Sequence, residues 1–187
     1  MRAVVDEQGE QDEAVGLRLG DRAAWASYYE RVYPTMLAYA QRRLGSHDAA
    51  SDAVAEALAR TVATVARMSS LEVSPDAWGF GILRHVVHDV WRRRGRERRG
   101  VGPAGPAAPD PSELAGLSDE HRVVREAFDR LSATDREVLE LRVIAQLSSE
   151  EVAAILAMSP GAVRMAQARA IGRLRAMVND DGDDDDD

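Results

Sequence analysis

The sequence predicts an all-helical protein of two small domains joined by a flexible linker. Apolar residues recur at helical spacing in five or six segments, and strand signals are weak along the whole chain. Residues 95–117 are rich in glycine and proline and have no periodicity. We therefore expect helical domains over residues 14–94 and 118–178, with a disordered acidic N-terminus over 1–13 and a disordered acidic tail over 179–187.

The first two helices of the N-terminal domain are predicted from their start and stop signals. Asp21 is suited to cap the first helix, and Pro34 fits the first turn of a second helix, which Gly45 ends. Their apolar residues form a packing stripe of Trp25, Tyr28, Tyr29, Val32, Leu37, Ala40 and Leu44.

Two longer helices are predicted to complete this domain. The third covers Asp48 to Met68, and the fourth runs from Asp76 or Ala77 to Arg94, after a loop over residues 69–75. We expect the core to receive Val54, Leu58, Val62 and Val65 from the third helix, and Trp78, Phe80, Ile82, Leu83, Val86, Val87 and Val90 from the fourth.

The C-terminal domain contains the most informative stretch, residues 148–178. Ser132 with Asp135 starts its central helix, and Ser148 stands three residues before Glu151, the spacing of a capping box. A second start signal, Ser159 followed by proline, opens a helix whose charged residues are Arg164, Arg169, Arg173 and Arg175. Two short capped helices around a tight turn, the second purely basic, are typical of a helix-turn-helix that places its second helix in the major groove of DNA.

The net charge of −8 conceals a basic middle of the chain. Residues 1–13 carry five acids and one arginine, and residues 179–187 carry seven aspartates. The segment between them has 23 arginines against 20 acids, and six of these arginines lie within residues 92–99. This cluster and the basic helix after Ser159 both lie where contacts to phosphates would be needed.

The length of the linker bears on how the two domains could bind DNA. Its 23 residues span roughly 25–29 Å when relaxed and at most about 76–83 Å when stretched, whereas two turns of B-DNA measure about 70 Å. Only a nearly taut linker would let the domains reach sites two turns apart, which favours assembly on a large scaffold over autonomous binding.

Several functional classes are disfavoured by the sequence. It has no cysteine, hence no disulfide or thiolate metal site, no apolar stretch near its start that resembles a signal peptide, and no run of 18 apolar residues. Motifs of enzyme active sites are not visible, so we expect no enzyme and no cofactor. His85, His88 and Asp89 lack a fourth ligand, so we expect no metal site. A cytoplasmic protein follows as the default.

Both halves resemble one family. The segments DRAAWASYYERVYPTMLAYAQRRLG, HDAASDAVAEALARTVA and DAWGFGILRHVVHDVWRRRGR in the first half, and LSATDREVLELRVIAQLSSEEVAAILAMSPGAVRMAQARAIGRLR in the second, are similar to regions 2 and 4 of the sigma-70 superfamily. The resemblance is to its compact extracytoplasmic-function (ECF) class. It implies a protein that binds core RNA polymerase at the clamp coiled coil and the flap, reads a −35 element as duplex through region 4, and captures an unpaired −10 strand through region 2.

The resemblance also implies roles for particular residues. Asp48, Asp52 and Glu56, at i, i+4 and i+8, would form an acidic face that binds the polymerase clamp, although Ala55 stands where the family commonly has glutamine. The unpaired strand would be bound by Arg84, His85, His88, Asp89, Arg92 and Arg93, beside a loop over 69–75 that would hold a flipped base. The −35 duplex would be bound by Ser159, Arg164, Met165, Ala168, Arg169 and Arg173.

Two departures in the recognition helix and several alternatives remain open. Ala166 stands where the family often has a basic residue, and Gln167 where it usually has an apolar one, so direct readout would rest on fewer polar contacts. The chief rival function is a one-component regulator that binds duplex DNA without polymerase, and a third is a protein-binding adaptor. The aspartate-rich tail, residues 179–187, is either a solubilising tail or a segment that folds back and competes with DNA. An anti-sigma protein is a further possible partner.

Overall fold

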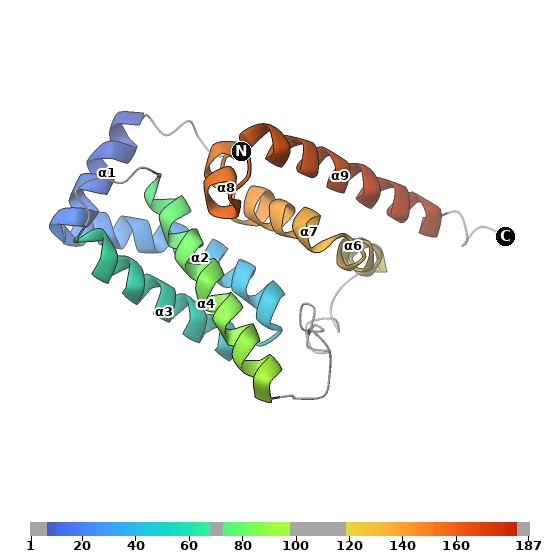
Figure 1. The fold of residues 1–187 in the computed structure, drawn as a ribbon, viewed down its shortest axis with the longest axis horizontal. Coiled ribbons are helices and arrows are strands. Elements are labelled where there is room, and N and C mark those ends of the chain that lie inside the picture. The colour runs from blue at the N-terminus through green and yellow to red at the C-terminus, as the bar shows by residue number, and fades with distance from the viewer. Residues whose placement is uncertain (1–6, 68–72, 98–118, 183–187) are drawn as a thin grey trace.

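The computed structural model describes residues 7–67, 73–97 and 119–182, and the secondary structure of these residues is helical throughout (Figure 1). The first domain contains α1 (Glu7–Leu19), α2 (Arg22–Leu44), α3 (His47–Val65) and α4 (Pro75–Glu97). The second contains α6 (Asp119–Asp129), α7 (Ala133–Leu139), a π-helical turn η1 (Glu140–Ile144), α8 (Ser149–Leu156) and α9 (Pro160–Gly182). The all-helical class predicted from the periodicity is confirmed.

The predicted caps are present. The Asp21 carboxylate accepts a hydrogen bond from the backbone N–H of Ala24 at 2.8 Å, and Gly45 ends α2 in the left-handed conformation at φ 63°. Ser148 and Glu151 form the complete capping box of α8, and the Ser159 hydroxyl accepts from the N–H of Ala162 at the start of α9. These signals act within three or four residues, which explains why the sequence was sufficient to place them.

The break expected at Pro34 is wrong, because α2 continues through this residue from Arg22 to Leu44. A proline inside a helix removes one backbone hydrogen bond and costs about 3 kcal/mol. Residues on both sides of Pro34 pack into the same core, with Tyr28 and Val32 before it and Met36 after it fully buried. This burial outweighs the local preference.

The N-terminus also differs from the expectation of disorder over 1–13, since residues 7–13 form the first half of α1. Leu17 is buried in the core, and its carbonyl accepts a hydrogen bond from the indole of Trp25. Glu13 forms a bidentate pair with Arg31 of α2, with both N···O distances 2.7 Å. At the other end, α9 extends to Gly182, and so includes the first residues of the expected tail. The remaining tail, 183–187, and the linker from residue 98 lie outside the described residues.

The core of the first domain follows the predicted periodicity with two exceptions. Tyr29 and Val62 were expected to face inward and are instead 48% and 49% exposed. Val62 lies outside the buried face of α3, which consists of Ala50, Ala53, Val54, Ala57, Thr61 and Val65. Trp78 and Phe80 of α4 pack in or against the core as expected.

The two domains lie directly against each other. Helix α8 packs on α4, η1 packs on α2, and buried residues of both domains form one hydrophobic cluster. Figure 1 shows α6 to α9 on one side of the α1–α4 bundle, with α9 extending away from it. The closed arrangement was not expected from the sequence, which predicted two domains connected only by a linker.

Candidate nucleic-acid interfaces

The N-terminal turns of α9 present an exposed, basic surface. Arg164, Met165, Ala168 and Arg169 are all exposed, and Met165 is 64% accessible to solvent. Arg164 lies 3.3 Å from Glu150 of α8, an exposed ion pair that contributes little to stability. Ser159, at the start of α9, is also exposed. The predicted duplex-binding residues therefore lie on one side of a helix that can enter a groove.

The two residues that depart from the family pattern do not belong to this exposed surface. Ala166 is completely buried against the core of the helix-turn-helix. Gln167 accepts a hydrogen bond from the guanidinium of Arg142 at 2.9 Å. Ala166 thus packs α9 against the core, and Gln167 joins it to Arg142. Neither residue lies on the surface proposed for DNA, so the structure does not support the expectation that they reduce the polar contacts to DNA.

A buried carboxylate holds the C-terminal half of this surface. Asp135 of α7 is 3% exposed and accepts a hydrogen bond from Arg173 at 2.9 Å, with Arg169 at 3.9 Å. The side chains of Arg169 and Arg173 remain more than half exposed. This contact orients both side chains of α9 before any DNA is bound, a role of Asp135 that the sequence did not indicate beyond its place in the first turn of α7.

The tight turn between α8 and α9 depends on a residue in an unusual conformation. Ala157 ends α8 in the left-handed region at φ 53° and ψ 44°, a position that favours glycine. The N–H of Met158 then bonds to the carbonyl of Ala153. The sequence predicted the turn and gave no signal for this strained alanine.

The residues predicted to bind an unpaired strand on α4 fall into two groups. The C-terminal part of α4 carries His88, Asp89, Arg92 and Arg93. There Arg92 and Asp89 approach to 3.5 Å, and the His88 ring lies 5.7 Å from that of Trp91. His85 is exposed one turn earlier, and its Nδ1 lies 2.7 Å from the carbonyl of Gly81. Cationic groups beside aromatic rings suit phosphates and stacked bases.

Arg84 is separated from this group because it faces the second domain. Its guanidinium donates a hydrogen bond to Glu137 of α7 at 2.9 Å. Arg43 of α2 lies beside it, bonded to Glu140 of η1 at 2.7 and 2.5 Å and 3.5 Å from Glu137. The sequence missed this charge cluster because its members lie up to 97 residues apart in the chain.

Burial shapes the electrostatics of that cluster. Glu140 is 3% exposed and Arg43 is 9% exposed. Burial raises the pKa of the Glu140 carboxyl, and the adjacent Arg43 guanidinium opposes the rise. Arg42 also reaches the cluster, 3.8 Å from Glu140, and its guanidinium lies over the ring of Phe128 at 4.3 Å. The carboxylates and arginines of opposite domains thus neutralise each other.

The predicted acidic face of α3 lies apart from these contacts. Asp48 and Asp52 are exposed, and Glu56 is bonded to Arg60 at 2.5 Å. Helix α3 packs on α1, α2 and α4. Two of the three predicted carboxylates are therefore accessible to a large partner, and the third shares its charge with a neighbouring arginine.

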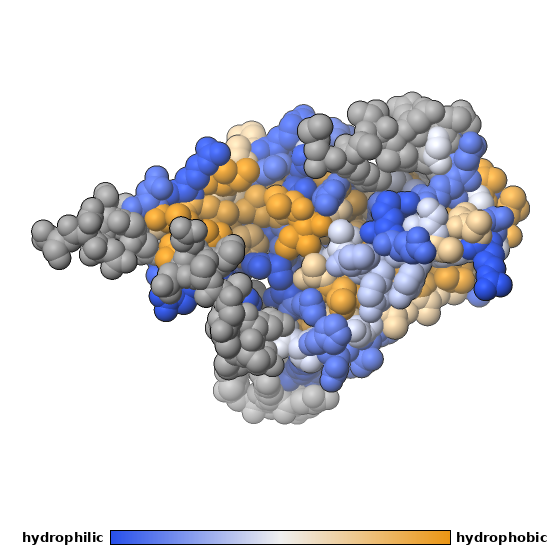
Figure 2. Space-filling model, turned by 180° about the vertical axis from the view of Figure 1, so that it is seen from behind, coloured by the Kyte–Doolittle hydropathy of each residue, from blue (hydrophilic) through white to orange (hydrophobic). Residues whose placement is uncertain are grey.

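The second domain also has an apolar hollow of about 460 Å³. Figure 2 shows a broad hydrophobic area on this side of the molecule, seen from behind. The residues that line the hollow are Arg42, Val124, Arg125, Phe128, Leu139, Val143, Ile144, Ile171 and Leu174. Val143 is 61% exposed, so the apolar lining of this hollow is accessible from solvent there.

Membrane spans and metal-binding clusters are not found in the described part of the chain. No helix there is long and apolar enough to cross a membrane. Within the same residues, His, Cys, Asp and Glu side chains form no group of three that could hold a metal ion.

Comparisons with known proteins identify both halves. The family model of sigma-70 region 2 matches residues 28–97, and that of sigma-70 region 4 matches residues 127–176. The ECF RNA polymerase sigma factor SigD of Mycobacterium tuberculosis is 33% identical over 186 residues, which cover 94% of this chain and 88% of SigD. The ECF sigma factor ShbA of Streptomyces griseus is 33% identical over 171 residues, covering 85% and 90%.

Solved structures agree with this result. The sigma factor RpoE of Bartonella quintana, in complex with the anti-sigma factor NepR, has a TM-score of 0.64 and 28% identity, over 82% of this chain and 96% of RpoE. CnrH, in complex with the cytosolic domain of CnrY, has a TM-score of 0.66 over 92% of this chain and 98% of CnrH. At 20% identity the second likeness is one of fold.

Proposed function

The chain belongs to the extracytoplasmic-function sigma factors of the sigma-70 superfamily, and we propose which of its surfaces bind polymerase and which bind promoter DNA. It is a sigma factor that directs core RNA polymerase to promoters, with region 4 for the −35 duplex and region 2 for the melted −10 strand. The family is not a family of enzymes.

The exposed N-terminal half of α9 is the observation that carries the proposal for duplex DNA. Arg164 and Arg169 can donate to guanine edges, and Met165 and Ala168 offer apolar contact to thymine methyl groups. Ser159 and Arg173 would contact the backbone, since they lie at the first turn and four residues after Arg169 respectively. Asp135 supports the assignment because it holds two of these arginines in place.

The −10 strand would be bound along the C-terminal part of α4. His88, Arg92 and Arg93 supply rings and charges there, and His85 lies one turn before them. Asp89 orients Arg92 through their ion pair. Arg84 can join this set only after it leaves Glu137.

Core polymerase would be held at two surfaces. Asp48 and Asp52 on α3, with Glu56 beside them, suit a basic edge of the clamp coiled coil. The apolar hollow around Phe128 and Val143 suits a hydrophobic segment of the flap. An anti-sigma protein is a further proposed partner, as for the related RpoE. The chain would act in the cytoplasm, where polymerase meets the chromosome, and would have no catalytic activity.

Run-off transcription with purified core polymerase tests the function as a whole. Promoter fragments selected from a random pool by the assembled holoenzyme should yield defined transcripts, which neither component yields alone. The rival one-component regulator predicts the opposite pattern, a tight shift of duplex DNA by the free chain and no transcripts with core polymerase.

A charge reversal on α3 tests the polymerase surface separately. Asp52→Arg should weaken binding to fluorescently labelled core polymerase by about tenfold or more, because like charges then face each other. Glu30→Arg is the matched control, since Glu30 is an exposed acid on α2 outside the proposed surface. Equal affinities of the two variants would remove α3 from the polymerase interface.

A further inference from the structure

The apolar hollow of about 460 Å³ is lined by an arginine whose charge is incompletely paired. Arg42 of α2 faces this hollow together with side chains of α6, α7, η1 and α9. The carboxylate of Glu140 is bonded by Arg43 at 2.5 and 2.7 Å, which leaves Arg42 a longer ion pair of 3.8 Å. The Nε of Arg42 is buried and has no hydrogen-bond partner among the described residues. Such donors are rare in folded proteins, because an unmet buried hydrogen bond is costly.

The electrostatic surroundings of Arg42 favour an added anion. Burial lowers the pKa of its guanidinium below the usual value. The carboxylates of Glu140 and Asp129 oppose this fall in pKa, whereas the positive charges of Arg125 and Arg136 add to it. Arg125 also lines the hollow. The Arg42 side chain is 30% exposed, so an anion in the hollow can reach its guanidinium and stabilise the charged form.

The remaining lining of this hollow suits an aliphatic molecule. Apart from the two arginines and Phe128, the lining residues are all aliphatic. The Phe128 ring already has the Arg42 guanidinium over it at 4.3 Å, so this face is closed to stacking with an aromatic ligand. Val143 is 61% and Val124 47% exposed, which leaves the lining open to solvent. A volume of about 460 Å³ lies within the range of small-molecule sites, about 300–1,000 Å³.

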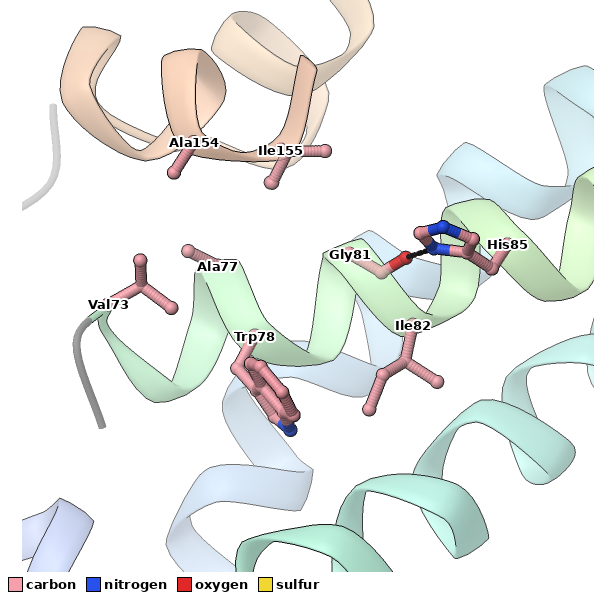
Figure 3. A pocket seen from close by; sticks show the side chains of 8 residues that line it. All are labelled: Val73, Ala77, Trp78, Gly81, Ile82, His85, Ala154 and Ile155. Atoms are coloured by element: carbon pink, nitrogen blue, oxygen red, sulfur yellow. Dashed lines mark hydrogen bonds between the residues drawn. The ribbon is translucent and has the colours of Figure 1, made fainter. Parts of the chain in front are cut away.

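A second hollow, of about 290 Å³, lacks the charged group. Figure 3 shows it between α4 and α8, with Trp78 and Ile155 among its lining residues. Its His85 is bonded through Nδ1 to the carbonyl of Gly81 at 2.7 Å. Among the residues that the structure describes, no arginine or carboxylate lines it. An uncharged apolar molecule can therefore enter either hollow, whereas an anion selects the one that contains Arg42.

We propose that the hollow around Arg42 is a binding site for a small aliphatic carboxylate of the kind of a medium-chain fatty acid. The carboxylate pairs with the Arg42 guanidinium, and the chain packs on the aliphatic lining around Val143. The bound molecule occupies the surface proposed above for the flap, so it lowers the affinity for core polymerase. This consequence rests on the proposed function, whereas binding of the carboxylate does not.

Calorimetric titration of the free chain with decanoate and with 1-decanol tests the site. The two molecules have the same chain length and differ in charge. Decanoate should thus bind about tenfold more tightly, as expected for a charge-assisted hydrogen bond. Arg42→Met should abolish this preference, and Arg22→Met, which removes an exposed arginine from the same helix, should retain it. Equal affinities of the natural chain for decanoate and decanol would overturn the proposal.

A second pair of variants locates the ligand without altering Arg42. Val143→Glu adds a carboxylate at an exposed position of the lining and should weaken decanoate binding about tenfold, because like charges repel. Val62→Glu makes the same change at a half-exposed valine of α3, outside the hollow, and should leave the affinity unchanged. Equal decanoate affinities of these two variants would show that the ligand does not bind in this hollow.

Competition with polymerase tests the consequence for assembly. Saturating decanoate should weaken binding of the natural chain to labelled core polymerase by about fivefold or more. The Arg42→Met variant should not respond to decanoate, which controls for direct effects on polymerase. An unchanged polymerase affinity of the natural chain would refute competition at the flap surface. Failure of the chain to bind polymerase at all would count against the proposed function, and calorimetry would still decide whether the carboxylate site exists.

Discussion

Replacement of Gly79 by alanine should destabilise the first domain, although alanine is the better helix former. Gly79 lies inside α4, and a Cβ atom at this position would stand 2.1 Å from the Tyr28 hydroxyl oxygen and 2.8 Å from the methyl carbon of Met36. Tyr28 is fully buried, its ring packs edge-on against Trp25, and its hydroxyl donates to the carbonyl of Pro75 at 3.2 Å. Met36 can rotate away, but Tyr28 has to shift by about 1 Å to restore an ordinary contact distance.

The magnitude follows from three contributions. Overpacking of a dense core costs about 1–3 kcal/mol, and loss of the buried hydroxyl's partner costs about 1–3 kcal/mol. The helical preference of alanine over glycine returns about 1 kcal/mol. Gly79→Ala should therefore lower the free energy of unfolding by about 1–5 kcal/mol.

Two comparison variants make this measurement decisive. Gly81 lies two residues further along α4, and a Cβ atom added there would have open space within 4 Å; Gly81→Ala should thus raise the free energy of unfolding by about 0.5–1 kcal/mol. Tyr28→Phe removes the obstructing oxygen, so Gly79→Ala should cost less in that background than in the natural chain. Urea unfolding followed by far-ultraviolet circular dichroism measures each of these proteins. Equal stability of the two alanine variants would refute the steric argument.

Three further substitutions test other features of the fold. Ala157→Gly should raise the melting temperature by relieving the left-handed strain of a non-glycine residue, worth about 1 kcal/mol; no gain in a thermal scan would contradict this. Pro34→Ala should restore one hydrogen bond of α2 and raise the free energy of unfolding in urea by up to about 3 kcal/mol; an unchanged urea midpoint would show that α2 carries no such cost. Ala166→Arg should abolish cooperative unfolding of the second domain, because it forces a charge into a fully buried position. Ala168→Arg, at a more accessible position of the same helix, should leave the unfolding transition unchanged. Similar melting curves of the two variants would show that Ala166 is not enclosed.

The predictions for Gly79, Gly81 and Ala166 depend on which side of a helix a residue occupies, and the sequence was a reliable guide to that only where packing is regular. It correctly placed Phe80, Leu83 and Val86 inside. It failed at Val62, because the neighbouring Thr61 takes the buried position on α3, and at Ala166, which a comparison with the family pattern had placed towards DNA. Helix periodicity predicts roughly which face of a helix is buried. The packing of neighbouring helices determines whether a residue at the margin of that face is buried or exposed.

The sequence by itself determined the helical class, the caps at Asp21, Ser148 and Ser159, and the helix-turn-helix that indicates DNA binding. These features arise from interactions between residues a few positions apart, whose energies depend little on the rest of the chain. Only the tertiary structure decided that α2 passes through Pro34, and that Arg84 and Arg43 face carboxylates of the other domain. Burial and ion pairing between distant segments depend on distances that local patterns do not encode, so the closed state of this sigma factor emerged only from the packing of its domains.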